Sequence, residues 1–243
     1  MPKIQISPVA FNENIKLKSV IERFLKSGMR ARADLVIIDD GSTDDTTAVI
    51  ASYREFGVRT VKHPQRRGVG AAIRTAIRHA QQNNCEVLVI MAGNDKDSPD
   101  EITLLVEPIL NDGFDLVQGS RYLGHDRTGG DMPFYRRLAT RLHPWLMTAI
   151  TGKLITDSTN GFRAMRLALF QDARINLDQE WLNAYELEPY ILFKAFTLGY
   201  KVREVPVTKI YPPRKLGYTK MKPIVGWWSI LKPLFYLGLG IRK

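Results

Sequence analysis

Short aliphatic runs alternate with segments of helical periodicity along the first half of the chain. The aliphatic runs predict strands, at residues 4–10, 35–38, 58–61, 87–91 and 115–118. Polar turns and amphipathic segments between these runs predict helices, which end near residues 27, 56, 83 and 110. Strands that alternate with helices of this length are typical of an α/β fold built on a mostly parallel sheet.

The regular alternation stops near Gly119, where a polar, glycine-rich segment begins. Beyond it we expect a helix, a loop entering a strand or short helix, a strong helix and a strand, at residues 133–152, 157–164, 181–198 and 201–207. The apolar segment at residues 223–241 approaches the length that spans a bilayer, but Lys232-Pro233 interrupts it. A clean transmembrane helix is therefore not expected there.

Two carboxylates directly follow one of the aliphatic runs. Residues 35–38 are all aliphatic, and Asp39, Asp40 and then Gly41, which permits a tight turn, come next. Open α/β sheets bind ligands at the carboxyl ends of such buried strands. We therefore expect a binding site at this turn, although the two acids could instead cap the next helix and solvate the loop.

The net charge narrows the class of partner. Apolar content of 44% and charged content of 25% are ordinary for a soluble globular protein, whereas the net charge of +10 is high. It favours an anionic partner: a phosphorylated substrate, a membrane surface or nucleic acid. We expect no nucleic-acid partner, because no recognised nucleic-acid-binding motif occurs.

The cysteine content and the N-terminal residues indicate the cellular compartment in which we expect the protein. Cys85 is the only cysteine, which excludes an internal disulfide and a cysteine-rich zinc site. The first residues lack the apolar core of a signal peptide. Cytoplasmic residence is the expectation.

Six short blocks carry a family resemblance. They are Pro-Val-Ala-Phe-Asn-Glu at residues 8–13, Asp-Asp-Gly-Ser at 39–42, Arg-Gly-Val-Gly-Ala-Ala at 67–72, Gly-Ser-Arg-Tyr at 119–122, Asn-Gly-Phe-Arg at 160–163 and Glu-Val-Pro at 204–206. In this order they resemble the family-2 glycosyltransferases of GT-A fold. Within that family they are similar to the polyprenyl-phosphate (dolichol-phosphate-mannose-synthase-like) sugar transferases, over about residues 4–220.

The resemblance implies an organisation and an activity. Residues 1–220 would be one GT-A catalytic domain, with a nucleotide-sugar-binding half at 1–118 and an acceptor half at 119–220, before an apolar, basic tail at 221–243. The implied enzyme is an inverting transferase that moves a hexosyl unit from a nucleotide-diphosphate sugar to a polyprenyl phosphate. Two alternatives stay open: a transferase to a saccharide hydroxyl in cell-surface polysaccharide synthesis, and a non-catalytic nucleotide-sugar-binding or membrane-associated protein.

The resemblance also implies a nucleotide-binding set. Pro8, Phe11 and Glu13 would flank the base, and the turn with Asp39 and Asp40 would accept hydrogen bonds from the base or ribose. A carboxylate at a strand end is independently a good acceptor for such N–H and O–H groups.

A basic, glycine-containing turn comes before the third expected helix. Arg66, Arg67 and Gly68 lie there, and free N–H groups at a helix start would suit the donor phosphates. The alternative is a solvated basic turn in which the glycines serve helix packing.

The loop after the fourth strand departs from the family pattern. The family carries an Asp-Ala-Asp metal motif at this point, where this chain has Ala-Gly-Asn at residues 92–94. We expect Asn94 and Asp97 to hold Mg²⁺ or Mn²⁺, since oxygen ligands suit hard cations. Two alternatives are open: Lys96 could neutralise the diphosphate directly, or Asp97 could simply cap the helix that starts near Pro99.

The acceptor decides whether a base is needed. A lipid phosphate is already largely ionised near neutral pH and needs none. The basic residues that would seat it, with a hydroxyl neighbour, are Arg121, Arg136, Arg137, Arg214, Thr219 and Lys220. A saccharide hydroxyl would require a carboxylate base, for which Asp157 is the first candidate and Glu188 the second.

The apolar, basic tail at residues 221–243 bears on the choice between a lipid phosphate and a saccharide hydroxyl as the acceptor. Its paired tryptophans, Trp227 and Trp228, with lysines and arginines nearby, favour an anchor at an anionic membrane surface. The expected location is therefore peripheral, at the inner face of the cell membrane. The alternative is a helix that packs on the domain or across the interface of a homodimer.

Overall fold

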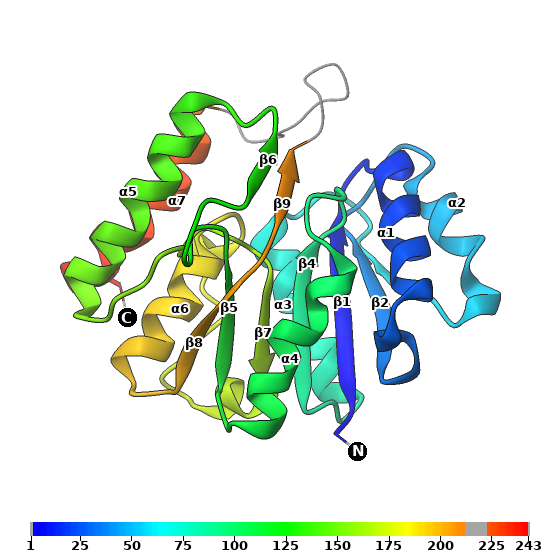
Figure 1. Ribbon diagram of the computed structural model, residues 1–243, viewed down its shortest axis with the longest axis horizontal. Helices are drawn as coiled ribbons and strands as arrows, with labels where there is room; N and C mark the ends of the chain where they lie inside the picture. Colours follow the sequence, from blue (N-terminus) through cyan, green and yellow to red (C-terminus); the bar gives the residue numbers. More distant parts are fainter. Residues whose placement is uncertain (1, 212–222, 243) are drawn as a thin grey trace.

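A seven-stranded sheet forms the centre of the molecule (Figure 1). The computed structural model describes residues 2–211 and 223–242, except for the side chains of residues 223–227. In their order across the sheet, the strands are β3 Arg59–Lys62, β2 Ala33–Asp39, β1 Ile4–Ala10, β4 Val87–Ala92, β7 Arg163–Arg166, β5 Leu116–Ser120 and β8 Val202–Pro206. Only β7 runs antiparallel to its neighbours within this sheet, so the predicted mostly parallel α/β sheet is confirmed.

Helices cover both faces of the sheet, and each face has its own apolar core. Buried side chains of α1 Asn14–Lys26, α2 Thr46–Ala51 and α4 Ile102–Asn111 form one core. The other core contains buried side chains of α3 Val69–Gln82, α5 Phe134–Thr151, α6 Leu187–Thr197 and α7 Pro223–Gly238. Short 3₁₀ helices lie at Gly28–Ala31, Arg54–Phe56, Pro99–Glu101, Leu167–Gln171 and Glu180–Leu182.

Side-chain size and spacing explain the tight packing beside β2. Its aliphatic residues 35–38 are all buried, as expected for a strand covered on both faces. On α3, Ala72, Ala76 and Ala80 recur every fourth residue and are fully buried. These small side chains let α3 lie close to the sheet, which fixes the turn that follows β2 relative to the start of α3.

Two long helices flank one end of the sheet. α5 and α7 lie side by side, and α7 also packs on α6 (Figure 1). Leu234 and Leu237 of α7 are buried, so this part of the apolar tail belongs to the folded domain. Nowhere in residues 2–211 and 223–242 is a helix both long and apolar enough to cross a bilayer. A separate two-stranded sheet, β6 Thr128–Gly130 with β9 Lys209–Tyr211, lies above the main sheet in the view of Figure 1.

One expected helix is shorter than predicted. The segment 181–198 has a 3₁₀ turn at Glu180–Leu182 and an irregular stretch before α6 begins at Leu187. The reason is tertiary: the carbonyl of Asn183 accepts a hydrogen bond from the backbone N–H of Ala71, at 3.1 Å, on α3. Periodicity within the segment does not reveal a backbone group used by a distant helix.

Candidate active site

A cavity of about 420 Å³ opens at the carboxyl ends of β1, β2 and β4. The loops after these strands form one end of it, and α5 and α7 form the other. We call these the loop end and the helix end, lined respectively by Phe11, Asp40 and Arg66 and by Leu142, Ile230 and Leu231. The cavity therefore joins a polar strand edge to an apolar gap between two helices.

Asp39 serves the turn itself. Its Oδ1 accepts a hydrogen bond from the Ser42 backbone N–H at 2.8 Å, and its Oδ2 accepts one from Thr47 Oγ1 at 2.7 Å. The side chain is fully buried, and it does not line the cavity. Asp39 thus holds the turn to the side chain of Thr47 on α2, and contact with a nucleotide stays a prediction for it.

Asp40 braces the neighbouring loop from the cavity wall. Its Oδ1 accepts from the backbone N–H of Arg67 and pairs with His63 Nδ1, both at 2.8 Å. Its Oδ2 accepts from the backbone N–H of Gly68 at 2.9 Å. The carboxylate thus fixes the basic turn at the loop end, and contact with a nucleotide stays a prediction for Asp40.

The glycines at the start of α3 are needed for packing. Gly68 has φ +102°, and a Cβ there would lie 2.4 Å from the Asn183 carbonyl oxygen. A Cβ on Gly70 would lie 2.1 Å from the Leu182 carbonyl oxygen. Since residues 182–184 cover this helix start and Asp40 uses the Gly68 N–H, few free N–H groups remain there for a phosphate. The packing alternative holds for these glycines, and phosphate binding by Arg67 and Gly68 stays a prediction.

Aromatic and charged groups form the outer part of the loop end. The guanidinium of Arg66 lies over the Phe11 ring, 4.3 Å from its centroid, and Glu13 pairs with Lys16 at 3.2 Å. All four line the cavity. Pro8 does not line it, because it is buried within β1 and pairs with Met91 of β4. Of the residues predicted to bind the nucleotide, Phe11, Glu13 and Asp40 are thus brought together at the cavity. Pro8 lies within β1, outside the cavity.

The loop after β4 treats its two predicted metal ligands differently. Oδ1 of Asn94 is buried and has no hydrogen-bond partner among the described residues, and Asn94 lines the cavity. Asp97 is buried behind it: Oδ1 accepts from Lys209 Nζ at 2.6 Å, and Oδ2 accepts from the Ala92 N–H at 3.0 Å. The structure therefore presents Asn94, but not Asp97, as an available ligand.

Lys96 projects from this loop among other cations. It is buried, lines the cavity, and its Nζ lies 5.2 Å from the centroid of the Tyr211 ring. Burial lowers the pKa of Lys96 to about 7, and the charges of Arg136, Lys209 and Lys16 add to the shift. A bound anion would act in the opposite direction, because it favours the charged form.

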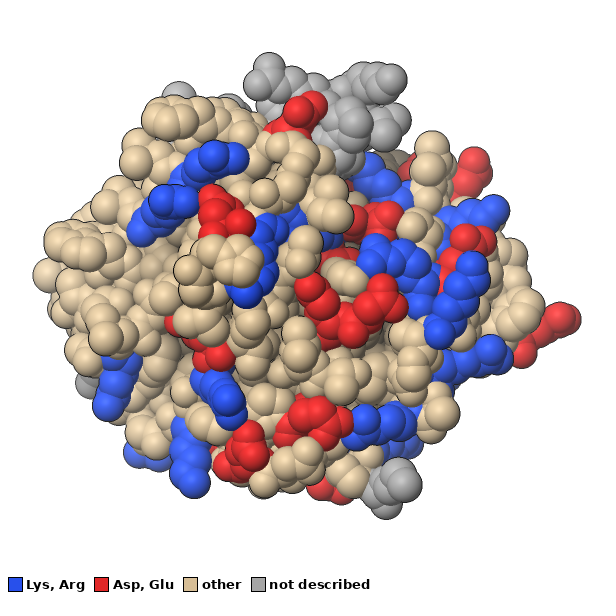
Figure 2. Space-filling view, in the orientation of Figure 1, with Lys and Arg blue, Asp and Glu red and all other residues tan. Residues whose placement is uncertain are grey.

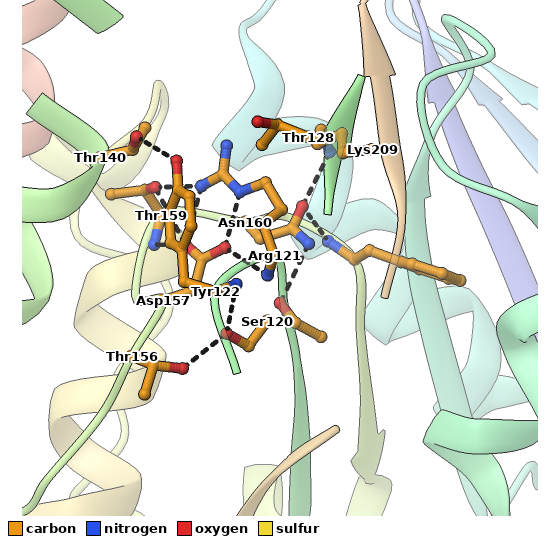
Figure 3. A network of polar contacts seen from close by, with 12 residues as sticks. Ser120, Arg121, Tyr122, Thr128, Thr140, Thr156, Asp157, Thr159, Asn160 and Lys209 are labelled. Atoms are coloured by element: carbon orange, nitrogen blue, oxygen red, sulfur yellow. Dashed lines mark hydrogen bonds and ion pairs between the residues drawn. The ribbon is translucent and has the colours of Figure 1, made fainter. Parts of the chain in front are cut away.

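Arg121 and Asp157 form a buried ion pair behind the helix end (Figure 3). Arg121 donates to Asp157 through Nε at 2.6 Å and Nη2 at 2.7 Å, and its backbone N–H donates at 3.1 Å. Burial would raise the pKa of Asp157, but the charge and hydrogen bonds of Arg121 outweigh it and hold that pKa below its ordinary value. Tyr211 and Thr159 accept the remaining guanidinium hydrogen bonds.

This geometry corrects the expectation that Asp157 is a general base. Its side chain is 0% exposed, it does not line the cavity, and both oxygens are engaged by Arg121. An ion-paired carboxylate with a depressed pKa is a poor proton acceptor near neutral pH. Glu188 is the better placed acid, because it lines the cavity and burial raises its pKa, with Arg163 and Lys209 opposing part of the shift.

The fold places some of the remaining basic candidates at the cavity and others outside it. Arg136 lines the cavity, with its guanidinium 5.5 Å from the centroid of the Tyr211 ring. Arg121 lines it too, although only 1% of its side chain is exposed. Arg137 lies one residue further along α5 and is exposed outside the cavity. Three further candidates lie outside the described residues: Arg214, Thr219 and Lys220.

The outer face of α5 carries an apolar stripe. Its four residues recur at helical spacing and are Phe134, Leu138, Leu142 and Trp145, with Phe134 80% and Trp145 67% exposed. Leu142 also lines the cavity, so the stripe continues into the helix end. Figure 2 shows basic side chains beside uncharged surface in the region of α5, and acidic and basic groups interspersed over the rest of that face.

Two residues of the site carry no recognisable sequence signal. Lys209 and Tyr211 lie on β9, beyond the strand predicted at residues 201–207. Lys209 is buried, and besides Asp97 it donates to Asn160 Oδ1 at 2.7 Å (Figure 3). A lysine in a polar segment is ordinarily solvated, so only the tertiary structure reveals this one.

Comparisons with known proteins agree with this architecture. The family described as Glycosyl transferase family 2 matches residues 9–174. A dolichyl-phosphate hexose transferase of Haloferax volcanii is 30% identical over 213 residues, covering 87% of this chain and 83% of the relative. A UDP-N-acetylglucosamine–dolichyl-phosphate N-acetylglucosaminyltransferase of Methanococcus voltae is 26% identical over 218 residues, covering 83% of each chain.

A solved structure supports the fold. Glucosyl-3-phosphoglycerate synthase from Mycobacterium tuberculosis, in complex with Mn²⁺, UDP-glucose and phosphoglyceric acid, superposes with a TM-score of 0.69 at 20% identity. The match covers 100% of this chain and 81% of that one. At this level of identity the likeness establishes the shared fold.

Proposed function

This chain belongs to glycosyl transferase family 2, and we propose that it moves a hexosyl unit from a nucleotide sugar to a polyprenyl phosphate. The observation that carries the proposal is the continuous cavity, which runs from a polar strand edge to an apolar gap between α5 and α7. The loop end suits a nucleotide diphosphate, and the helix end suits the first isoprene units of a lipid. The names of the relatives from Haloferax volcanii and Methanococcus voltae support the same acceptor class.

The reaction needs only one displacement. An ionised oxygen of the lipid phosphate forms the new bond to the anomeric carbon while the bond to the donor diphosphate breaks, and the electron pair leaves with the diphosphate. Such a displacement inverts the anomeric configuration. Because a phosphate monoester is already ionised near neutral pH, no protein base is required. Arg136, which lines the cavity, would hold the acceptor phosphate.

Mg²⁺ or Mn²⁺ belongs to the proposal, with a reduced set of protein ligands. The unpartnered, buried Oδ1 of Asn94 fits a hard cation. When bound, such a cation stabilises negative charge on the departing diphosphate. Transfer should therefore fall in a chelator and recover with added Mg²⁺ or Mn²⁺, and full transfer in chelator would contradict a metal role.

The apolar stripe on α5 supports a peripheral place on the membrane. Phe134, Leu138 and Trp145 can enter the interface, while Arg137 and Arg141 on the same helix meet anionic lipid headgroups. The helix end of the cavity would then open toward the bilayer that holds the acceptor. We propose the inner face of the cell membrane as that surface.

Glu188 favours a second candidate function. A buried carboxylate with a raised pKa in the cavity could deprotonate a saccharide hydroxyl, as a transferase of the same fold would require. This function predicts release of nucleoside diphosphate with soluble saccharides and no need for lipid.

The test is transfer by the purified full chain. GDP-, UDP-, dTDP- and CDP-linked hexoses are supplied with vesicles that contain, or lack, a polyprenyl phosphate. We expect labelled lipid and nucleoside diphosphate to form only when the lipid phosphate is present. Transfer to a saccharide without lipid would support the second candidate, and binding without any transfer would support a non-catalytic protein.

A further inference from the structure

The loop that follows β4 is poor in free oxygen ligands. β4 ends at Ala92, whose side chain has no ligand atom, and Gly93 follows it. Throughout residues 2–211 and 223–242, no group of three or more His, Cys, Asp or Glu side chains is gathered as a metal site would require. The unpartnered oxygen of Asn94 is a single neutral ligand, and one neutral ligand contributes little charge toward a diphosphate.

Both carboxylates of this loop are paired within the protein: Asp95 lies 3.3 Å from the Arg23 guanidinium and does not line the cavity, and Asp97 is held by Lys209. Asp97 is 0% exposed, and the Lys209 ammonium lies 2.6 Å from its Oδ1. The Ala92 N–H holds its other oxygen. Releasing Asp97 toward a cation would leave Lys209 buried without its counter-ion, which is strongly unfavourable.

Cationic groups from separate elements converge on the same part of the cavity. Lys96 comes from the loop after β4, Lys209 from β9 and Arg136 from α5, and all three line the cavity. Lys96 Nζ and the Arg136 guanidinium lie against one ring, that of Tyr211, at 5.2 Å and 5.5 Å from its centroid. Only 5% of Lys96 is exposed, so water screens its field weakly.

We propose that Lys96 is the principal counter-charge for the donor diphosphate, so that the chain binds a nucleoside diphosphate without a divalent cation. The inference rests on the proposed function, because it concerns the donor of that reaction. An ammonium is a compact point charge that can bind phosphate oxygens as a metal ion does, although it provides one positive charge instead of two. Lys209 supplies further positive charge beside it, part of which Asp97 offsets.

This assignment separates binding from turnover. Lys96 and its neighbours hold the diphosphate when metal is absent, and the cation near Asn94 acts mainly on the rate. Nucleotide affinity is then nearly independent of metal, whereas transfer depends on it. A site whose metal is the main diphosphate ligand would lose both in a chelator.

Calorimetric titration of the full chain tests the proposal. The probes are GDP, UDP, dTDP, CDP and inorganic pyrophosphate, each titrated in EDTA and in excess Mn²⁺. For the nucleotide that binds best, we expect dissociation constants within about threefold of each other in the two conditions. Lys96→Met should weaken binding in EDTA by roughly 10- to 100-fold, which is the usual value of a hydrogen bond to a charged group.

Two matched variants control the measurement. Lys96→Arg keeps the charge and should bind within several-fold of the parent chain in EDTA. Lys201→Met removes a lysine that is exposed beside the start of the edge strand β8 and does not line the cavity, and it should leave binding unchanged. Urea unfolding of each variant checks that the fold is retained, and binding of the phosphate-free nucleoside should not change in Lys96→Met.

The outcomes are distinguishable. Binding that requires Mn²⁺ in the parent chain, or a Lys96→Met variant that binds as the parent does, would overturn the role of Lys96 alone. If none of the nucleoside diphosphates binds under either condition, the proposed function fails and this inference fails with it. Loss of binding in both Lys96→Met and Lys96→Arg, with the fold intact, would show that shape rather than charge matters and would also overturn it.

Discussion

The two ends of the cavity are held in place by different interactions. At the loop end, the turns after the strands bond to each other's backbone, as Asp40 does with the N–H groups of Arg67 and Gly68. At the helix end, buried His143 of α5 bonds to Ser158 and to the Ile230 carbonyl of α7, and the Arg121–Asp157 ion pair is buried behind it. We infer that the helix end responds to protonation, because burial shifts the pKa of His143, which links α5 to α7.

The largest effect should come from breaking the buried ion pair at the helix end. Asp157→Asn leaves Arg121 charged and 1% exposed without its counter-ion, which costs about 3–5 kcal/mol of unfolding free energy. Urea unfolding near neutral pH measures this loss. If Asp157 were instead a catalytic base, the variant would keep its stability and lose only its rate.

An exposed pair provides the control for Asp157→Asn. Asp112 and Arg203 form an ion pair with side chains 52% and 47% exposed. Asp112→Asn should cost less than about 1 kcal/mol, since water screens such pairs. Equal losses of unfolding free energy in the two variants would show that the buried Arg121–Asp157 pair contributes no more to stability than the exposed pair does.

The second effect is a response of the helix end to acid. His143 on α5 bonds to Ser158 at 2.6 Å and, through Nε2, to the Ile230 carbonyl of α7 at 3.2 Å. Burial lowers the pKa of His143 to about 4 from 6.5, and Arg163 adds to the shift while the Ile230 carbonyl and Asp157 oppose it. The folded protein therefore favours the neutral form of His143.

The sign of the pH dependence follows from that pKa. The unfolded chain binds a proton at His143 below about pH 6.5, and the folded chain binds it only near pH 4, so stability falls as pH drops through this window. Unfolding free energy should be about 2 kcal/mol lower at pH 5 than at pH 7 from this residue alone. His143→Gln should remove that part of the difference in urea unfolding. Hydrogen exchange at pH 5 should increase in α7 before it increases in β1 and β2; the reverse order would contradict the comparison.

The loop end is also the part that the sequence predicts best. Residues 35–38 and the acids after them lie close together along the chain, so strand, turn and capping chemistry are all local. The same local pattern predicts the loop after β4, and the family resemblance shows the departure at residues 92–94. The local pattern does not assign roles to these residues. Whether Asp39 and Asp97 face the cavity depends on their partners Thr47 and Lys209, which periodicity does not reveal.

The helix end was less predictable for a physical reason. The partner of Asp157 is Arg121, which comes from a different loop, and the cavity wall needs α7 to pack on α5. A carboxylate in a polar loop has the same sequence signature whether it is a base or a buried counter-ion. The pattern allowed for a strand near β7 but did not predict its antiparallel direction, since strand direction is set by the sheet and not by the strand's own residues.

The third effect concerns the membrane. Leu138→Glu places a charge in the exposed apolar stripe of α5, and binding to anionic vesicles should weaken roughly tenfold, because half-burying such a side chain contributes a little over 1 kcal/mol. Leu104→Glu, on α4, is the matched control at a similarly exposed leucine and should bind as the parent does. Co-sedimentation measures both.

This substitution is a sharper probe than removing the tail. A chain ending before Pro223 would also lose Leu234 and Leu237, which are buried in the core. Leu138→Glu should leave nucleotide binding at the loop end unchanged. Equal vesicle binding by the Leu138 and Leu104 variants would show that the stripe on α5 is not a membrane surface.

The smallest expected effect is at Glu188. Its side chain is 17% exposed at the cavity, and removing its charge by Glu188→Gln keeps the shape of the wall. If the acceptor is a lipid phosphate, the attacking oxygen is already ionised, and transfer to polyprenyl phosphate should change by less than about threefold. If the acceptor is a saccharide hydroxyl, the same variant loses its base, and transfer should fall by roughly 10²- to 10⁴-fold. Initial rates with polyprenyl phosphate and, separately, with a saccharide acceptor, at saturating donor and over a range of pH, separate the two. A rate that follows the ionisation of a carboxyl group in the parent chain and becomes flat in Glu188→Gln would assign the helix end to a hydroxyl acceptor.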